Sequence, residues 1–518
     1  MATTSDKIAQ PPLKRPRLVV YPEPAAAAAH VELNPADCNL DFEIGGGGLR
    51  GKALHEGGSA YCWSGARATV GIRGGGRYCF GCKILAEQSV EMEDTDADQR
   101  HLCRVGVSRG DDSVCGLGVS GYSFGFEGTG KLAHHGKFFD YGMKFGVGDT
   151  IVCSVDLDSK PMASIRFSRN GERPGIAKRF DASARGLGLV DAPVRPMQWE
   201  SAIFPHVLLK NVVVEMQFSR DDGLEAVHGY EPWTSACADG NAVSGPVFAD
   251  QGECELLMMV GLPASGKSTW AEKWVTEHEE KRFVLLGTDL ALEQMKLIGW
   301  LGKTCHQERF DRFMDRATVV FKTLLNRATQ IPRNYIIDRM HLNKIERIRT
   351  LYPFEKYRKT AVVVFPTPQK LKERSAKRYR ETWKEVPSET VHKLTATFVL
   401  PLAKDMPGSM EPLDEVIFVE LSRDNAQRIL DYLRHSTSKH GNNVTSTSIG
   451  PVSGWQSERG SIRYETKSSL KAPDKQLIHP ISAKVLLLQI LCRNCISLLV
   501  YILMSCSNLC TPSLLTKL

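Results

Sequence analysis

The sequence predicts a multidomain protein in which an all-β sandwich is followed by an α/β domain with a parallel sheet. Three observations predict this order. Short apolar runs separated by turn residues fill the first half, near-continuous apolar runs alternate with helical patterns in the second, and a glycine-rich loop joins the first of those runs to a helix. A length of 518 residues leaves room for two or three domains, and 42% hydrophobic with 24% charged residues is typical of a folded chain.

Residues 1–30 are predicted to be a disordered basic N-terminus, because proline and alanine dominate them. Lys14, Arg15 and Arg17 lie between prolines and resemble a nuclear localisation signal, although a solvated charged tail has the same composition. The net charge of +7 permits a polyanionic partner without requiring one.

Residues 31–220 are predicted to form the β-sandwich. Five runs read as strands of four to eight residues: "RYCFGCKIL", "HLCRVGVSR", "DTIVCSVDL", "ASIRFSRNG" and "NVVVEMQFS". Asn170-Gly171 indicates a hairpin, because both residue types tolerate the positive φ of a type I′ turn.

Five segments resemble the successive strands of a SPRY domain, in this order: "GRYCFGCKI", "CRVGVSRG", "YGMKFGVGDTIVCSVDLDS", "IRFSRNGERPGIA" and "IFPHVLLKN". The resemblance implies a β-sandwich that binds a protein ligand through its loops and has no catalytic residues of its own.

Residues 221–253 are expected to be a linker, and residues 254–435 the α/β domain. The apolar runs "CELLMMVGL", "RFVLLGTD", "NYIIDRM", "TAVVVFP" and "EVIFVEL" are typical of strands buried on both faces. Helical patterns such as "ERFDRFMDRATVVFKTLLNRA" separate them, which predicts a parallel sheet with helices on both faces.

A phosphate-binding loop follows the first of these strands. Gly261, Gly266, Lys267 and Ser268 satisfy G-x-x-x-x-G-K-[ST] between a predicted strand and a predicted helix. Backbone N–H groups of such a loop surround a phosphate, the lysine reaches the β- and γ-phosphates, and the serine hydroxyl completes the magnesium shell. The predicted ligands are ATP, or another purine nucleoside triphosphate, and Mg²⁺. The predicted contacts are Gly261, Leu262, Pro263, Ala264, Ser265, Gly266, Lys267, Ser268 and Thr269.

Phosphoryl transfer would need further groups. Asp289, after the second strand, is a candidate base, or alternatively the N-cap of the helix that follows. Asp338 ends the "NYIID" strand and is a second candidate magnesium ligand beside Ser268. Arg374 and Arg378 lie on a helix that could close over phosphate as a lid, or could simply face water.

The order of the loop, "GTD", "NYIID", "AVVVFP" and "VPSETVHKLTATFVLP" is similar to the polynucleotide-kinase-like domain of the heterogeneous nuclear ribonucleoprotein U family, which also carries a SPRY domain directly before it. The resemblance implies a nuclear, RNA-associated protein whose kinase-derived domain binds nucleotide at Lys267 and Ser268, with kinase activity not the expected role. Asp289 falls where polynucleotide kinases keep their acceptor base. This chain departs from the family at Arg339-Met340-His341, where a Gln-Thr-Asn run is usual.

Nucleic acid would be bound through charge. Residues 333–380 contain fourteen Lys and Arg against four Asp and Glu, beside Tyr352, Phe354, Tyr357 and Tyr379. Basic residues interleaved with aromatics can neutralise phosphates and stack bases, although ordinary helix-surface charge gives the same pattern.

Three functions are consistent with the sequence. The first is a nuclear ribonucleoprotein component acting in RNA processing, which binds ATP without turnover. The second is an active 5′-hydroxyl polynucleotide kinase, and the third is a protein-interaction adaptor whose nucleotide is structural. A polar linker at 436–484 and an apolar tail at 485–518 complete the chain, and the tail reads as a membrane anchor or as a splice-variant tail.

Overall fold

The computed structural model describes residues 30–440 except 94, 160–161, 194, 296–306 and 383–386. The basic cluster at 14–17 and the segments 441–484 and 485–518 therefore lie outside the described residues. Among the described residues, no helix is both long enough and apolar enough to cross a membrane.

The first domain is a sandwich of two sheets, which confirms the predicted all-β SPRY-like fold. Sheet A has the order β1 (Leu33–Cys38), β4 (Ser64–Ala68), β14 (Ile203–Lys210), β7 (Leu102–Arg109), β8 (Ser123–Glu127), β9 (Lys131–His134) and β10 (Lys137–Asp140). In addition, β5 (Val70–Ile72) pairs with β14, and β17 (Ala242–Ser244) pairs with β5. Sheet B has the order β13 (Ile176–Phe180), β12 (Ala163–Arg169), β11 (Thr150–Asp156), β6 (Arg77–Glu87), β15 (Val212–Gln217), β3 (Arg50–Ala53) and β2 (Phe42–Gly45), with β16 (Glu231–Pro232) on β6.

The sandwich core lies between the two sheets. Phe80 and Phe167 of sheet B and Phe126 and Val207 of sheet A belong to one buried cluster. The predicted hairpin is present between β12 and β13, where Asn170 and Gly171 have φ of 49° and 85°. The central strands β7 and β14 are buried along their whole length, and the side chains that the two sheets direct toward each other form this core.

Residues 221–253 differ from the expected linker, because much of this segment folds onto the sandwich. It contains β16, α1 (Ser235–Ala238) and β17. Trp233 is fully buried in the sandwich core and donates its Nε1–H to the carbonyl of Val70 at 2.9 Å. One large aromatic residue carries this packing, which apolar periodicity does not reveal.

The second domain has a five-stranded parallel sheet, as predicted. Its order is β19 (Val284–Leu286), β20 (Tyr335–Ile337), β18 (Glu255–Val260), β21 (Arg358–Val363) and β22 (Glu415–Phe418). The first strand, β18, is central, and the third and fourth strands flank it on opposite sides. The crevice beyond the carboxyl end of β18 is thus the switch point at which such sheets bind ligands.

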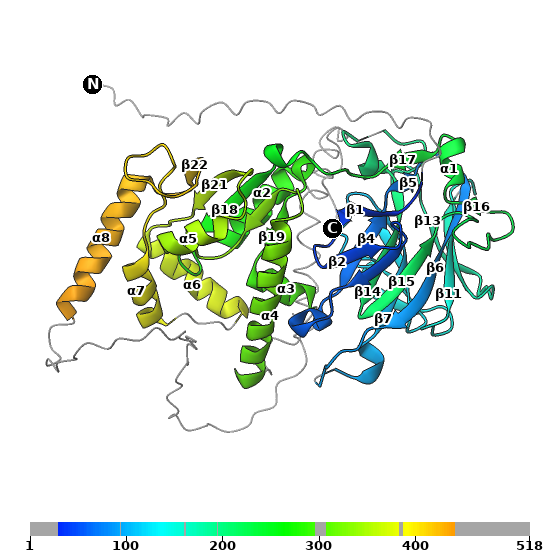
Figure 1. Ribbon diagram of the computed structural model, residues 1–518, viewed down its shortest axis with the longest axis horizontal. Helices are drawn as coiled ribbons and strands as arrows, with labels where there is room; N and C mark the ends of the chain where they lie inside the picture. The colour runs from blue at the N-terminus through cyan, green and yellow to red at the C-terminus, as the bar shows by residue number, and fades with distance from the viewer. Residues whose placement is uncertain are drawn as a thin grey trace, which may run out of the picture. The chain divides into compact units, whose positions relative to one another are not determined.

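Helices cover both faces of this sheet, which is drawn in green to yellow in Figure 1. Alternate residues of β18 point to opposite faces: Leu256, Met258 and Val260 join one buried cluster, and Leu257 and Met259 join the other. The helices are α2 (Lys267–Glu277), α3 (Thr288–Gln294), α4 (Gln307–Ala328), α5 (Lys344–Leu351), α6 (Pro368–Thr382), α7 (Ser388–Thr397) and α8 (Arg423–His440). Short 3-10 helices are η1 (Gly57–Tyr61), η2 (Ala97–Gln99), η3 (Gln198–Ser201), η4 (Gln251–Glu253) and η5 (Glu279–Lys281).

Candidate nucleotide-binding site

The loop between β18 and α2 has the backbone geometry of a phosphate-binding loop. Ala264 and Gly266 have left-handed φ of 61° and 101°, and Gly266 is the N-cap residue of α2. Left-handed residues between right-handed ones turn successive N–H groups toward one point, and the helix N-terminus adds partial positive charge. The loop therefore presents donors at the switch point of the sheet.

Lys267 begins α2 and bends back over this loop. Its side chain is buried, and its Nζ donates to the Leu262 carbonyl at 2.8 Å. Ser265 is also buried, and its hydroxyl has no hydrogen-bond partner among the described residues. Ser268 and Thr269 follow on the first turn of α2 and are exposed. These are a cation and hydroxyl groups of the kind that contact phosphate and magnesium.

The predicted lid arginine Arg374 lies directly against the loop. Its Nη1 donates to the Ser265 carbonyl at 2.5 Å and to Glu420 Oε1 at 2.6 Å. Glu420 follows β22 and also faces Lys370 Nζ at 3.7 Å. Arg378 lies one turn further along α6 and is partly buried. The structure thus brings Arg374 to the loop.

Two carboxylates were predicted to complete the site. Asp338 follows β20, is partly buried and donates its N–H to the Leu286 carbonyl at 2.7 Å, so it lies where β19 and β20 end. Asp289 lies in the first turn of α3, whereas Gly287 holds the N-cap position because its carbonyl accepts from the Ala291 N–H at 3.1 Å. The N-cap alternative for Asp289 is therefore wrong; its side chain lies outside the described part of the structure.

The run Arg339-Met340-His341, where this chain departs from the family pattern, contacts the start of the phosphate-binding loop and the end of β18. The Met340 carbonyl accepts from the Gly261 N–H at 3.0 Å. His341 is buried with φ 43°, and its Nδ1 hydrogen-bonds the Met259 carbonyl at 3.0 Å. Burial lowers the pKa of His341 to about 4, so the ring is neutral near pH 7. The Arg339 guanidinium lies over the Phe321 ring at 4.9 Å.

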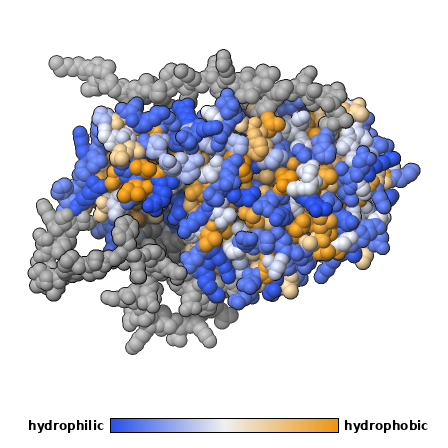
Figure 2. Space-filling view, in the orientation of Figure 1, coloured by the Kyte–Doolittle hydropathy of each residue, from blue (hydrophilic) through white to orange (hydrophobic). Residues whose placement is uncertain are grey.

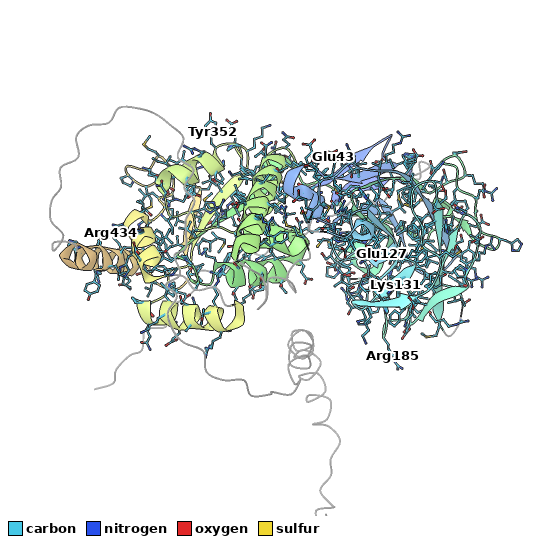
Figure 3. The ribbon with its side chains drawn as sticks, turned by 90° about the horizontal axis from the view of Figure 1, so that it is seen from below. Glu43, Glu127, Lys131, Arg185, Tyr352 and Arg434 are labelled. Atoms are coloured by element: carbon cyan, nitrogen blue, oxygen red, sulfur yellow. The ribbon has the colours of Figure 1, made fainter. Side chains whose placement is uncertain are left out.

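The basic segment 333–380 is less uniform than its composition indicated. Phe354 and Tyr357 are buried in the domain core and cannot stack bases, whereas Tyr352 and Tyr379 are 79% and 43% exposed. Arg347 is fully buried and pairs with Glu411. Figure 3 shows Tyr352 pointing away from the domain. The surface left for nucleic acid consists of exposed cations on and after α5 and on α6, with these two tyrosines.

Within the described ranges, no group of three or more His, Cys, Asp or Glu side chains is arranged to hold a metal ion. Mg²⁺ in nucleotide sites is held by one or two protein oxygens together with substrate phosphates and waters. A hydroxyl at Ser268 and a carboxylate at Asp338 fit that donor set.

Comparisons with known proteins agree with this architecture. The SPRY domain model matches residues 89–187, and the AAA domain model matches residues 256–401, which include the loop. The chain is 29% identical over 419 residues to heterogeneous nuclear ribonucleoprotein U-like protein 2 of Mus musculus and of Homo sapiens, covering 79% of this chain and 52% of each relative. It is 31% identical over 193 residues to the ATP-dependent RNA helicase Ddx1 of Drosophila melanogaster, covering 36% of this chain and 22% of the relative.

The chain spans about half the length of the U-like relatives. The predicted resemblance to the heterogeneous nuclear ribonucleoprotein U-like family, a SPRY domain followed by a P-loop kinase-like domain, is confirmed. Among solved structures, the SPRY domain of human HERC1 aligns at 19% identity and a TM-score of 0.25, covering 36% of this chain and 96% of that domain. A human SPRY domain aligns at 18% identity and 0.24, covering 34% and 94%.

Proposed function

We propose that this chain, with the domain order of the U-like ribonucleoproteins, is a nuclear, RNA-associated ribonucleoprotein component acting in RNA processing. In this proposal the SPRY sandwich binds a protein ligand, and the kinase-like domain binds ATP with Mg²⁺ without turning it over. The observation that carries the nucleotide half is the loop at the end of β18, with Lys267 buried in it and Gly266 capping α2.

ATP would be held by the residues from Gly261 to Thr269. The loop amides and Lys267 would neutralise the phosphates, and Ser268 and Asp338 would hold Mg²⁺, which draws charge from the β- and γ-phosphates. The Lys267 ammonium contacts the neutral carbonyl of Leu262. A phosphate oxygen carries negative charge that the Leu262 carbonyl lacks, so the ammonium would bind phosphate more strongly than it binds this carbonyl.

The contacts of Arg374 on α6 support a function in which ATP is bound but its phosphoryl group is not transferred. Phosphoryl transfer requires arginines that can neutralise the negative charge on the phosphoryl group as it moves. Arg374 is instead bound to Glu420 at 2.6 Å and to the Ser265 carbonyl, so a carboxylate already neutralises it. Moving this arginine away from Glu420 to follow the phosphoryl group would mean breaking their ion pair.

RNA association is supported by the exposed cations on α5 and α6 and by the names of the relatives. If six phosphates are neutralised on a single strand, log K falls with log salt at a slope of about −4. Such a surface binds with little sequence preference, because phosphate contacts carry no sequence information.

The nucleotide claim is tested by titrating the full chain with ATP and Mg²⁺ in a calorimeter, and then by incubating it with γ-labelled ATP and 5′-hydroxyl RNA. We expect saturable binding that is lost in Lys267→Ala, and no label transfer. Absence of binding by the wild-type chain would overturn the nucleotide half of the proposal.

The proposals of RNA association and of nuclear location are tested by experiments in cells. Ultraviolet crosslinking followed by recovery of the chain should yield covalently bound RNA, and a tagged chain should be found in the nucleus. RNA recovery no higher than that of an untagged control would remove the RNA claim.

A second function is favoured by one specific arrangement. Asp289 lies in the first turn of the helix that follows β19, at the carboxyl end of the sheet, where an acceptor hydroxyl would approach. A 5′-hydroxyl polynucleotide kinase would transfer label, and the transfer would disappear in both Lys267→Ala and Asp289→Ala. The third function, an adaptor, would show an ATP-induced rise in melting temperature without any RNA binding; a hundredfold excess over Kd stabilises by about 2.7 kcal/mol.

A further inference from the structure

Strand β10 is an end strand of sheet A with unusual exposure. It pairs with β9 on one side, and no other described strand pairs with it. All four of its residues are exposed, and Phe138 and Phe139 are 51% and 46% exposed although they alternate between the two faces. Natural proteins usually protect such edges with charges, prolines or bulges, because an apolar edge accepts another strand.

The register shows which backbone groups of β10 are free to pair. A two-residue turn at His135 and Gly136, with φ of 54° and 67°, joins β9 to β10 and places His134 opposite Lys137. In such a hairpin the flanking pair is hydrogen-bonded and the pairs then alternate. The Tyr141 N–H bond to the Gly130 carbonyl at 3.2 Å continues this alternation. Phe138 and Asp140 therefore direct their N–H and C=O groups away from β9.

A cavity of about 580 Å³ opens beside the end of β10. Phe126 and Phe167, both almost fully buried, belong to its lining, with Met143 and Pro174. Tyr141 fixes one wall, because its hydroxyl donates to the Gly175 carbonyl at 2.9 Å and accepts from the Phe167 N–H at 3.0 Å. The cavity suits an apolar side chain of a segment lying along β10. Figure 2 shows that apolar patches remain between polar residues on the surface of the described part.

Positive charge predominates at this edge, although the carboxylates of Asp140 on β10 and Glu172 in the cavity lining also lie here. Lys137 is on β10, Lys131 is opposite Asp140, Lys178 lies 6.0 Å from the Phe139 ring, and Arg173 lines the cavity. None of these four cations has an ion pair with a carboxylate among the residues that the structure describes. Glu127 and Lys131, both labelled in Figure 3, mark the neighbouring strands.

We propose that β10 is the docking edge of the SPRY sandwich, where an extended segment of a partner protein with alternating apolar and acidic residues adds a strand to sheet A. This deepens the protein-binding role proposed above and rests on it. Main-chain bonds to Phe138 and Asp140 would give affinity, the cavity would accept one apolar side chain, and the cations would select acidic neighbours.

The register disfavours a second copy of this chain as the occupant. Antiparallel self-pairing that opposed Lys137 to Asp140 would also oppose Phe138 to Phe139, and only one of those two residues directs its backbone outward. The registers that satisfy the backbone leave Lys137 opposite Tyr141 or Phe139, with no charge match. An acidic partner satisfies both requirements.

The test uses the full chain as bait for a displayed library of random twelve-residue peptides. We expect enriched sequences in which Asp or Glu alternates with aliphatic or aromatic residues. Their binding should weaken at least tenfold in Phe138→Pro, because the Phe138 amide points away from β9 and its loss leaves the hairpin bonds intact. Phe138→Thr, which keeps the amide, and Lys137→Glu should each weaken binding as well. Tyr432→Thr, which alters an exposed aromatic on α8 of the other domain, is the matched control.

A backbone readout separates strand addition from simple hydrophobic contact. N-methylation of alternate amides in one enriched peptide should abolish binding in one register and leave it unchanged in the other. Each variant must keep the wild-type melting temperature and ATP affinity, which shows that it is folded.

The contrary outcomes are distinct. Enriched peptides that bind Phe138→Pro as tightly as wild type would overturn the β10 assignment while the protein-binding role of the sandwich stands. No enrichment over an uncoated support would overturn both. Loss in Phe138→Pro of oligouridylate binding, or of a concentration-dependent dimer, without loss of any peptide would assign the edge to RNA or to self-association and overturn the proposal.

Discussion

Arg347 is a charged residue whose burial in the second domain requires a buried partner of opposite charge. It is fully buried and forms a two-pronged ion pair with Glu411 at 2.7 and 2.8 Å, while its Nη1 donates to the carbonyls of His341, Leu342 and Val399. Removing one partner of a buried pair leaves the other charge uncompensated. We expect Glu411→Ala to lower the free energy of unfolding by about 3–5 kcal/mol, measured by urea denaturation.

An exposed pair in the same domain is the control. Arg358 and Glu415 are 3.1 Å apart with side chains 62% and 45% exposed, so Glu415→Ala should cost less than about 1 kcal/mol. The double variant Arg347→Met, Glu411→Leu should recover much of the loss, because neither charge then remains buried. Equal losses in Glu411→Ala and Glu415→Ala would contradict this account.

His341 predicts a pH dependence of stability. Burial, with further help from nearby cations, lowers its pKa to about 4, whereas an unfolded histidine titrates near about 6.5. The unfolded chain therefore binds more protons between these values, and stability held above about pH 6.5 is lost as pH falls toward 4. Asparagine tolerates the left-handed φ of 43° and can donate to the Met259 carbonyl. His341→Asn should therefore reduce the loss in the free energy of unfolding between about pH 6.5 and about pH 4 by about 3 kcal/mol.

The comparison must be made between variants, because other groups titrate in the same range. Burial raises the pKa of Asp41 to about 6, so its protonation stabilises the native state as pH falls and opposes the effect of His341. Burial lowers the pKa of His206 to about 3, which acts in the same direction as His341. The exposed substitution His392→Asn on α7 should leave the profile of the wild type. A His341→Asn profile parallel to the wild type would contradict this account, because it would show that the ring takes up protons over the same pH range in the folded and the unfolded chain.

At the scale of elements, α6 acts on the nucleotide loop through Arg374. On ATP binding we expect its guanidinium to exchange the Ser265 carbonyl for phosphate, a charge-assisted bond worth about 1.5–3 kcal/mol. Arg374→Ala should therefore raise the Kd for ATP about tenfold or more in calorimetry. Lys372→Ala, an exposed cation on the same helix, should change the Kd little. The same Kd in both variants would place α6 outside the nucleotide site.

The elements also show how far the sequence reaches. Short apolar runs between turn residues predicted β6, β7, β11, β12 and β15, and a helical pattern predicted α4, because these elements bury apolar side chains. Composition gave the charges and aromatics of 333–380 but not their directions, so Phe354 and Tyr357 were grouped with exposed Tyr352. The packing of 221–253 depends on one tryptophan and on bridges two or three residues long.

Only part of the site could be predicted, again because a sequence does not show which distant residues pack together. A motif of fixed spacing identified the loop, because the chemistry depends on consecutive backbone positions. Glu420 and His341 were not identified as site residues, since tertiary packing alone brings them to Arg374 and to β18. A carboxylate just past an apolar strand was the available signal for Glu420, because the carboxyl ends of parallel strands meet at one crevice.

At the scale of the whole described chain, the sandwich and the second domain contact each other through ion pairs, hydrogen bonds and apolar side chains. Asp37 of the sandwich is fully buried between Arg67 of the same domain at 2.8 Å and Arg282 of the second domain at 2.5 Å. Burial alone would raise the pKa of Asp37, but the two guanidinium groups outweigh it and hold the pKa well below its usual range. Arg333 donates to the Cys38 carbonyl at 2.7 Å, and Tyr61 packs edge-on against Phe313 at 5.9 Å.

This contact predicts that the domains unfold together. Leu40, Ala60 and Cys62 of the sandwich belong to the same apolar cluster as Ala317 and Phe321 of α4, so separating the domains exposes core surface. We expect one calorimetric transition in the wild type, and ATP should raise its midpoint as a whole, because a ligand of either domain stabilises a unit that unfolds as one.

The triple variant Arg282→Ala, Arg327→Ala, Arg333→Ala removes the arginines that donate from the second domain to the sandwich at Asp37, Leu40 and Cys38. Asp37 keeps Arg67 as its partner, so the sandwich itself should stay folded. We expect two transitions, of which ATP shifts only one. Three exposed cations of the same domain, changed in Lys273→Ala, Arg349→Ala, Lys356→Ala, give the control, which should keep one transition. Two transitions already present in the wild type would mean that this contact is too weak to couple the domains, and nucleotide binding could then have no influence on the stability of the sandwich.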